Sequence, residues 1–91
     1  MIQETTTTMA PAQVLAAAKD FFTNRSGIYS AFLEQEGAEY ATFRGQGGEE
    51  LVIGATIVDG ATVVRGSTYL FGQQVSRFFA SLDPAPAEVA R

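Results

Sequence analysis

The central part of this chain consists of β-rich segments that are separated by short connectors containing glycine. The segments, rich in β-branched and aromatic residues, are 28–34, 38–45, 49–58 and 61–68. The connectors are Glu36-Gly37, Gln46-Gly47-Gly48 and Asp59-Gly60. Loops of two or three residues with glycine join neighbouring antiparallel strands, because glycine adopts the positive φ that these turns need. The sequence therefore predicts a four-strand antiparallel meander.

An amphipathic helix is predicted on either side of the meander. Pro11 suits the first turn of a helix, and the apolar residues after it recur at spacings of three and four up to Phe22, which predicts a helix over about 11–23. Asn24 and Gly27 provide its stop. A second apolar stripe consists of Phe71, Val75, Phe78, Phe79 and Leu82. This helix is expected to begin near Tyr69, with Ser67 or Thr68 as its cap, to place Gln73, Gln74, Ser76 and Arg77 on the solvated side, and to end at Asp83-Pro84.

The two ends of the chain give weaker signals. Residues 2–8 include four threonines in a row, which suit a strand better than a helix, although a frayed tail is the alternative. Residues 84–91 are expected to form a disordered C-terminal tail. Ninety-one residues suffice for one domain, so we expect a single α+β domain over 1–83 in the order β-α-β4-α, with the first strand left open.

Turn lengths predict which side chains share a face of the sheet. A two-residue Asp59-Gly60 loop pairs Ala55 with Val64, and the resulting core face carries Leu51, Ile53, Ala55, Ile57 and Val64. A three-residue loop at 46–48 places Phe43 opposite Leu51 inside and pairs Arg44 with Glu50 outside. An even-length loop would bury an unpaired Arg44, which is costly, and this favours the three-residue loop.

A loop at Glu36-Gly37 would place Phe32 beside Ala41, and Ser30 beside Phe43, on the inner face, where Gly66 also points. The residues then expected on the outer face are Tyr29, Ala31, Leu33, Tyr40, Thr42, Val52, Thr56, Val58 and Val63, interrupted by Arg44, Glu50 and Arg65. Scattered exposed apolar side chains are common, but a face this apolar is also typical of one covered by a second copy or another protein. The candidate interface residues are Tyr29, Leu33, Tyr40, Val52, Thr56, Val63 and Arg65.

Composition argues against several classes of function. Six basic residues are scattered singly among ten acidic ones, for a net charge of −4, so nucleic acid and anionic membrane surfaces are not expected partners. The chain contains no cysteine and no histidine, which removes thiolate and imidazole chemistry. No apolar run approaches the length of a membrane span. We therefore expect a cytoplasmic, non-enzymatic protein without a catalytic site, cofactor or metal.

Two local patterns have ordinary structural explanations. Glu34, Glu36 and Glu39, and the pair Glu49-Glu50, lie next to turns, where carboxylates are usually solvated. The glycines of 45–48 resemble a phosphate-binding loop, but they join two strands and lack the Lys-Ser/Thr that follows such a loop. A hairpin turn is the favoured interpretation.

The order of elements resembles the helix-grip folds, which include the Bet v 1/START-like polyketide cyclase and lipid-transfer superfamily and the TATA-binding-protein-like half-domains. The threonine-rich segment leading into 10–15 and the start of the last helix at 69–71 carry this resemblance. A full START-like domain has two more strands and a longer closing helix, so its ligand and catalytic residues are not transferred.

Three functional hypotheses follow. The first is a non-enzymatic interaction or accessory module that forms a homodimer or binds a protein partner through the outer face. The second is a START-like binder of a small apolar ligand, held between Phe32, Phe43, Gly66 and Phe71. The third is a cyclase-like enzyme that uses a carboxylate, a tyrosine and an arginine.

Overall fold

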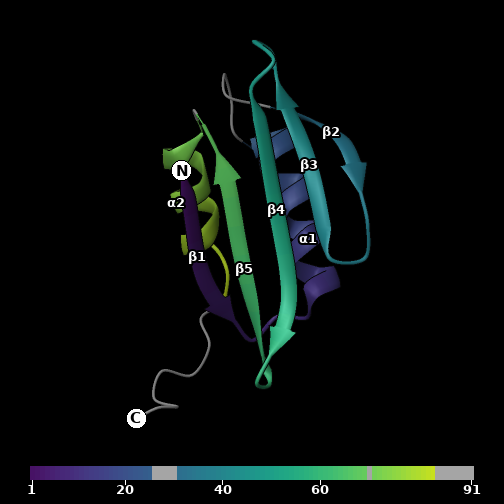
Figure 1. Cartoon of the computed structure of the whole chain (residues 1–91), viewed down its shortest axis with the longest axis vertical. Coiled ribbons are helices and arrows are strands. Elements are labelled where there is room, and N and C mark those ends of the chain that lie inside the picture. Colours follow the sequence, from purple (N-terminus) through teal and green to yellow (C-terminus); the bar gives the residue numbers. More distant parts are fainter. Residues whose placement is uncertain (26–30, 70, 84–91) are drawn as a thin grey trace.

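The computed structural model describes residues 1–25, 31–69 and 71–83, and it has an α+β fold (Figure 1). Five antiparallel strands form one open sheet in the order β1-β5-β4-β3-β2. The elements are β1 (Ile2–Thr7), α1 (Pro11–Asp20), a π-helical turn η1 (Phe21–Arg25), β2 (Ala31–Glu36), β3 (Tyr40–Gly45), β4 (Glu50–Val58), β5 (Ala61–Thr68) and α2 (Gly72–Ala80). The predicted β-α-β4-α order is confirmed.

The threonine-rich segment at the start of the chain is an edge strand. β1 pairs with β5 along its whole length, from Ile2 opposite Ser67 to Thr7 opposite Thr62. The pairing continues to Met1, whose ammonium donates to the carbonyl of Thr68 at 2.8 Å. β5, the last strand of the meander, therefore lies between β4 and the N-terminal strand β1.

Two of the three predicted hairpins have the predicted register. At the β4–β5 turn both Asp59 and Gly60 have positive φ, 53° and 84°, the pattern of a type I′ turn, and Ala55 lies opposite Val64. Gly48 also has a positive φ of 89°. The loop at 46–48 accordingly places Phe43 opposite Leu51, and Arg44 opposite Glu50.

Not every residue on the predicted core face is buried. Leu51, Ile53, Ala55 and Val64 are fully buried, but Ile57 is 64% exposed. The reason is visible in Figure 1, where the β4–β5 hairpin projects beyond the first turn of α1. A side chain at this tip points to the helix side of the sheet but has no helix to cover it.

The β2–β3 hairpin differs from the prediction. Its turn lies at 38–39, because the amide of Gly37 donates to the carbonyl of Tyr40 at 2.8 Å. The register also shifts between Leu33 and Gln35, which leaves Glu34 as the extra residue of a β-bulge. One extra residue moves every side chain beyond it to the other face of the sheet.

The bulge reverses the predicted orientation of the first half of β2. Phe32 lies opposite Arg44 on the outer face and is 57% exposed, so its predicted position beside Ala41 inside is wrong. Leu33 lies opposite Phe43 and packs against the core, and Ala31 is buried, so their predicted outer positions are also wrong. The predicted places of Tyr29 and Ser30 lie outside the described residues.

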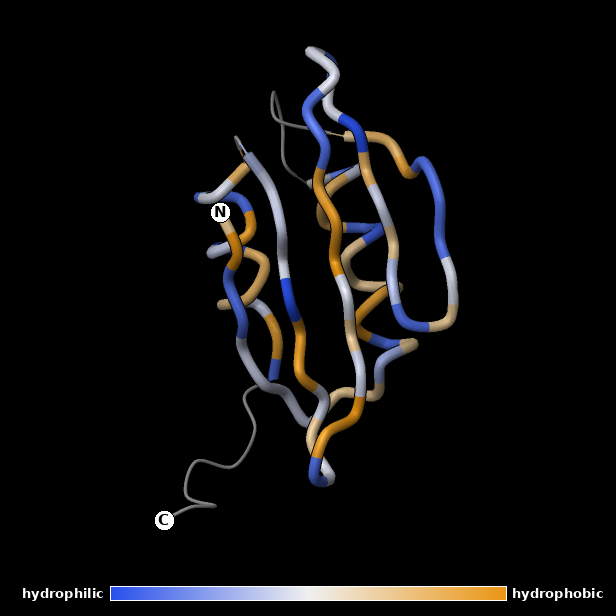
Figure 2. Tube along the Cα trace, in the orientation of Figure 1, coloured by the Kyte–Doolittle hydropathy of each residue, from blue (hydrophilic) through white to orange (hydrophobic). Residues whose placement is uncertain are grey.

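Both helices lie on one face of the sheet and bury their apolar sides against it (Figures 1 and 2). Pro11 is the first residue of α1, and the side chain of Gln13 accepts a hydrogen bond from the amide of Ala10 at 2.9 Å, which satisfies one free donor at the helix start. The helical path continues through η1 to Arg25, two residues beyond the predicted end. Phe22 is thereby placed against Phe43 on β3.

The core centres on three phenylalanines from three elements. The ring of Phe22 lies 5.5 Å from that of Phe43 on β3 and 5.3 Å from that of Phe78 on α2. All three are almost completely buried. Such tilted contacts between rings add to the stabilisation from burial, so this cluster holds both helices to the sheet.

The second helix begins later than predicted. α2 starts at Gly72, and the amide of Phe71 donates to the hydroxyl of Thr68 at 3.1 Å, so Thr68 contributes to the start of the helix. Val75 and Phe78 face the sheet as expected. Gln74, expected on the solvated side, is 6% exposed, because the helix presents a broader side to the core than its apolar stripe indicates.

Candidate functional site

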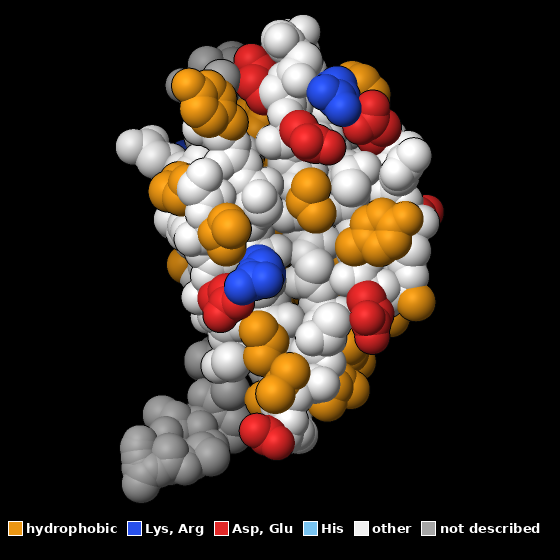
Figure 3. Space-filling view, viewed as in Figure 1, with side chains coloured by type: hydrophobic (Ala, Val, Ile, Leu, Met, Phe, Trp, Pro, Cys, Tyr) orange, Lys and Arg blue, Asp and Glu red, His pale blue; other side chains and the backbone are white. Residues whose placement is uncertain are grey.

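The outer face of the sheet, opposite the helices, is the candidate functional surface. Figure 3 shows this face from the same direction as Figure 1. The register places one residue from each of four strands in a row across it: Glu4 on β1, Arg65 on β5, Gly54 on β4 and Tyr40 on β3. Since β4 is the central strand, Gly54 lies near the middle of the face.

A hollow of about 260 Å³ lies on this face around Gly54, and its lining residues are Glu4, Gly54, Thr56, Val63 and Arg65. It exists because Gly54 has no side chain. A Cβ built there would have the carbonyl oxygen of Glu39, 3.7 Å away, as its nearest neighbour. The hollow is therefore bounded by β-branched side chains along the strands and by a charged pair at one side.

That charged pair is exposed. Nη2 of Arg65 lies 2.9 Å from Oε2 of Glu4, and the two side chains are 62% and 50% exposed. An ion pair this solvated contributes little to folding. Its consequence is electrostatic, since it leaves no unpaired charge at the wall of the hollow.

A second ion pair lies near the other edge of the face. Nε and Nη2 of Arg44 each lie 3.0 Å from an oxygen of Glu34, a bidentate arrangement, and Nη1 donates to the carbonyl of Gly48 at 2.9 Å. The hydrogen bond to Glu34, followed by the charge of Glu34, raises the pKa of Arg44. The bulge places Glu34 within reach of Arg44, whose cross-strand neighbour is Phe32.

Apolar side chains occupy the space between these pairs. Tyr40 is 41% exposed, Val58 49% and Ile2 61%, while Val52 and Val63 are partly buried. Figure 3 shows them as separate apolar patches distributed over the face rather than as one continuous stripe. The face thus combines moderate apolar character with two ion pairs.

The structure brings most of the predicted interface residues together. Five of them lie on the outer face: Tyr40, Val52, Thr56, Val63 and Arg65. Leu33 faces the core instead, and Tyr29 lies outside the described residues. The prediction missed Phe32, because Ala31, Phe32 and Leu33 are consecutive apolar residues and give no alternation from which a face could be chosen.

The residues predicted to line an apolar ligand site do not share a cavity. Phe43 and Phe71 are buried in the core, and Phe32 is on the opposite face of the sheet. The space beside Gly66 is filled, since a Cβ there would lie 2.7 Å from Cγ1 of Val75. Gly66 therefore permits close approach of α2 to the sheet.

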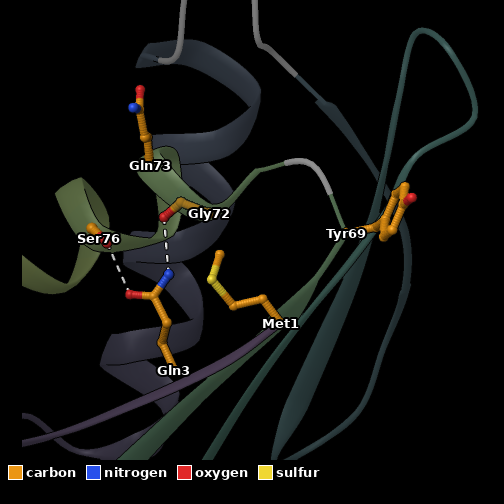
Figure 4. Close-up of a pocket in the computed structure, with 6 residues that line it drawn as sticks. All are labelled: Met1, Gln3, Tyr69, Gly72, Gln73 and Ser76. Carbon is orange, nitrogen blue, oxygen red and sulfur yellow. Dashed lines mark hydrogen bonds between the residues drawn. The ribbon is translucent and has the colours of Figure 1, made fainter.

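A shallow hollow of about 660 Å³ lies at the β1 edge, beside the start of α2 (Figure 4). Its lining residues are Met1, Gln3, Tyr69, Gly72, Gln73 and Ser76. The side chain of Gln3 donates to the carbonyl of Gly72 at 2.9 Å and accepts from the hydroxyl of Ser76 at 2.9 Å. Because these polar groups satisfy one another, the contact functions as a junction between β1 and α2.

Two general features complete the description of residues 1–25, 31–69 and 71–83. Within these ranges no three His, Cys, Asp or Glu side chains are grouped so that they could hold a metal ion. The same ranges contain no helix with the length and apolar character needed to cross a bilayer.

Comparison of this chain with protein-family models, with curated proteins and with solved structures found no match.

Proposed function

We propose that this chain is a non-enzymatic interaction module whose outer sheet face binds a second copy of the chain. The observation that carries the proposal is a sheet with both helices on one side and a charge-paired, partly apolar face on the other. Antiparallel sheets can leave one face in water, but that face then usually alternates to polar side chains. Here Tyr40, Val52 and Val63 occupy such positions.

The size of the face supports a dimer. The five strands contain 35 residues, and at about 3.4 Å per residue and about 4.8 Å between strands they cover about 570 Å². This area is near the lower limit of the roughly 600–1,000 Å² that each partner buries in a typical stable interface. A second copy offers a face of the same dimensions.

The charge distribution also favours a second copy. The ladder positions of the outer face and their ion-pair partners include Arg44 and Arg65 together with Glu4, Glu34 and Glu50. Figure 3 shows further acidic side chains toward the margins of the face. Because four of the five charges are already in ion pairs, association leaves few charges buried without a partner.

The other two hypotheses have no comparable support. An apolar ligand would need the space beside Gly66, which Val75 occupies. A cyclase-like enzyme would need a carboxylate, a tyrosine and an arginine around an enclosed site, but Arg65 and Tyr40 lie on an exposed face, on either side of Gly54.

Val52→Glu tests the proposal, because it places a charge on the outer face next to the central row. We expect the wild type to sediment as a dimer in the micromolar range and Val52→Glu to sediment as a folded monomer, with unchanged far-ultraviolet circular dichroism. Ala16→Glu, at an exposed position of α1, adds the same charge on the helix side and should remain dimeric. A wild type that stays monomeric throughout this range would refute self-association.

A further inference from the structure

We infer that Tyr40 of each copy inserts into the hollow at Gly54 of the other copy. This contact rests on the proposed self-association and specifies how the two faces fit together. The hollow, which covers parts of β4, β5 and β1, and the tyrosine on β3 lie in the same row across the sheet. An exposed ring and a recess thus lie on one surface, as a self-complementary interface requires.

Symmetry relates the projection to the recess. Two sheets that pack face to face keep their strands within about 30° of parallel. A two-fold axis parallel to β4 exchanges β3 with β5 and β2 with β1, because β4 is the third of five strands. Tyr40 on β3 then faces the β4–β5 side of the partner at the level of Gly54 and Arg65, where the hollow lies.

The hollow is not filled by Tyr40 of its own chain. The ring of Tyr40 lies against the backbone of Gly37, since a Cβ on Gly37 would be 2.3 Å from Cε1 of the tyrosine. The ring is thereby held toward the β2–β3 turn and away from Gly54. It is 41% exposed, so it presents apolar surface to a partner, and insertion requires the ring to rotate away from Gly37.

The dimensions and chemistry of the hollow suit a phenol ring. A volume of about 260 Å³ corresponds to roughly nine water molecules at about 30 Å³ each, more than a phenol ring requires. Thr56 and Val63 offer methyl groups, and the guanidinium of Arg65 can lie against the ring face, a favourable cation–π arrangement. Each dimer contains this contact twice.

Gly54→Val tests the contact between the two copies without destabilising the monomer. The Cβ position is open, and the backbone of Gly54 is outside the left-handed region, so the monomer accepts a side chain there. Valine favours strands and glycine weakens them, so the melting temperature of the dilute, monomeric variant should equal or exceed that of the wild type. The filled hollow should raise the dimer Kd by at least about 100-fold, because overpacking occurs at both contacts.

Three further variants complete the test. Tyr40→Ala should raise the Kd as Gly54→Val does, whereas Tyr40→Phe should leave it within a few-fold of the wild type. Ala61→Val is the matched control, since it adds a branched side chain to the same face near the hairpin tip, away from the hollow. If Gly54→Val unfolds, Gly54→Ala and Tyr40→Ala provide the same comparison.

The outcomes separate this inference from the proposed function. A wild type that never dimerises overturns both. A dimer that Val52→Glu dissociates, but that Gly54→Val and Tyr40→Ala leave unchanged, supports the outer face and overturns the tyrosine contact. A dimer that resists all three substitutions uses another surface and overturns both.

Discussion

Replacing Gly66 by alanine measures how closely α2 approaches the sheet. Gly66 is on β5 and faces the helices, and a Cβ there would lie 2.7 Å from Cγ1 of Val75, 3.4 Å from the ring of Phe79 and 3.5 Å from Cδ1 of Ile53. Val75 is fully buried, and a β-branched side chain in a helix has essentially one accessible χ1 rotamer. The methyl group therefore cannot be accommodated by a side-chain rotation, and α2 must shift.

The expected cost is a balance of two effects. Overpacking of this kind destabilises a core by about 1–3 kcal/mol. Replacing glycine by alanine reduces the conformational entropy of the unfolded chain, which returns about 0.4–1 kcal/mol. The midpoints of these two ranges leave a net loss of about 1.3 kcal/mol, and for a domain of this size each kcal/mol lowers Tm by about 4–8 °C. We therefore expect Tm to fall by about 5–10 °C.

Thermal unfolding followed by circular dichroism, at a fixed concentration low enough to exclude dimers, gives this difference. Gly54→Ala is the matched control, because Gly54 is on the neighbouring strand, points to the opposite face and has no atom within 3.4 Å of its Cβ position. Its Tm should be unchanged or higher. If Gly66→Ala melts at the wild-type temperature, the close packing of α2 on β5 is wrong.

Two further predictions concern the β2 bulge and the polar contacts of β1. Leu33→Glu should unfold the protein at ambient temperature or lower its Tm steeply, whereas Phe32→Glu should leave the Tm almost unchanged. The reason is that, of these two residues, Leu33 packs against the core. A larger loss of Tm in Phe32→Glu than in Leu33→Glu would contradict the bulge. Thr7→Val should lower the free energy of unfolding, measured in urea, by about 1–3 kcal/mol. The buried hydroxyl of Thr7 donates to the carbonyl of Asp83 and accepts from the amide of Met9, and valine can make neither hydrogen bond. An unchanged urea midpoint would show that these contacts are dispensable.

The sequence was sufficient where glycine chemistry left one choice of turn. At Asp59-Gly60 and at Gly48 the chain needs positive φ, and the residues there tolerate it. Those two turns determine the registers of β3, β4 and β5. The registers in turn place Tyr40 and Arg65 on the outer face. The sequence left open whether residues 2–7 form a strand, because their partner β5 is distant in the sequence and local patterns do not indicate such a pairing.

The errors occurred where local patterns did not determine the structure. The β2–β3 turn lies at Ala38 and Glu39, which carry no strong turn signal, while Glu36-Gly37 carried a misleading one. The bulge at Glu34 has no marker in the sequence either. Its bidentate contact with Arg44 becomes apparent only once the two strands are aligned. The hollow at Gly54 was also missed, because its shape depends on side chains from three strands.

The pairing of β1 with β5 bears on the order in which the molecule folds. Met1 and Thr68 are 67 positions apart, so this ladder forms only after a long stretch of chain has been brought together, whereas the β3–β4 and β4–β5 hairpins need only short loops. We expect the hairpins to be formed in the transition state and β1 to be added after it. Substitutions in β1, such as Thr5→Gly, should then accelerate unfolding and leave the refolding rate nearly constant. A slower refolding limb in stopped-flow measurements would instead place the chain's first strand in the folding nucleus.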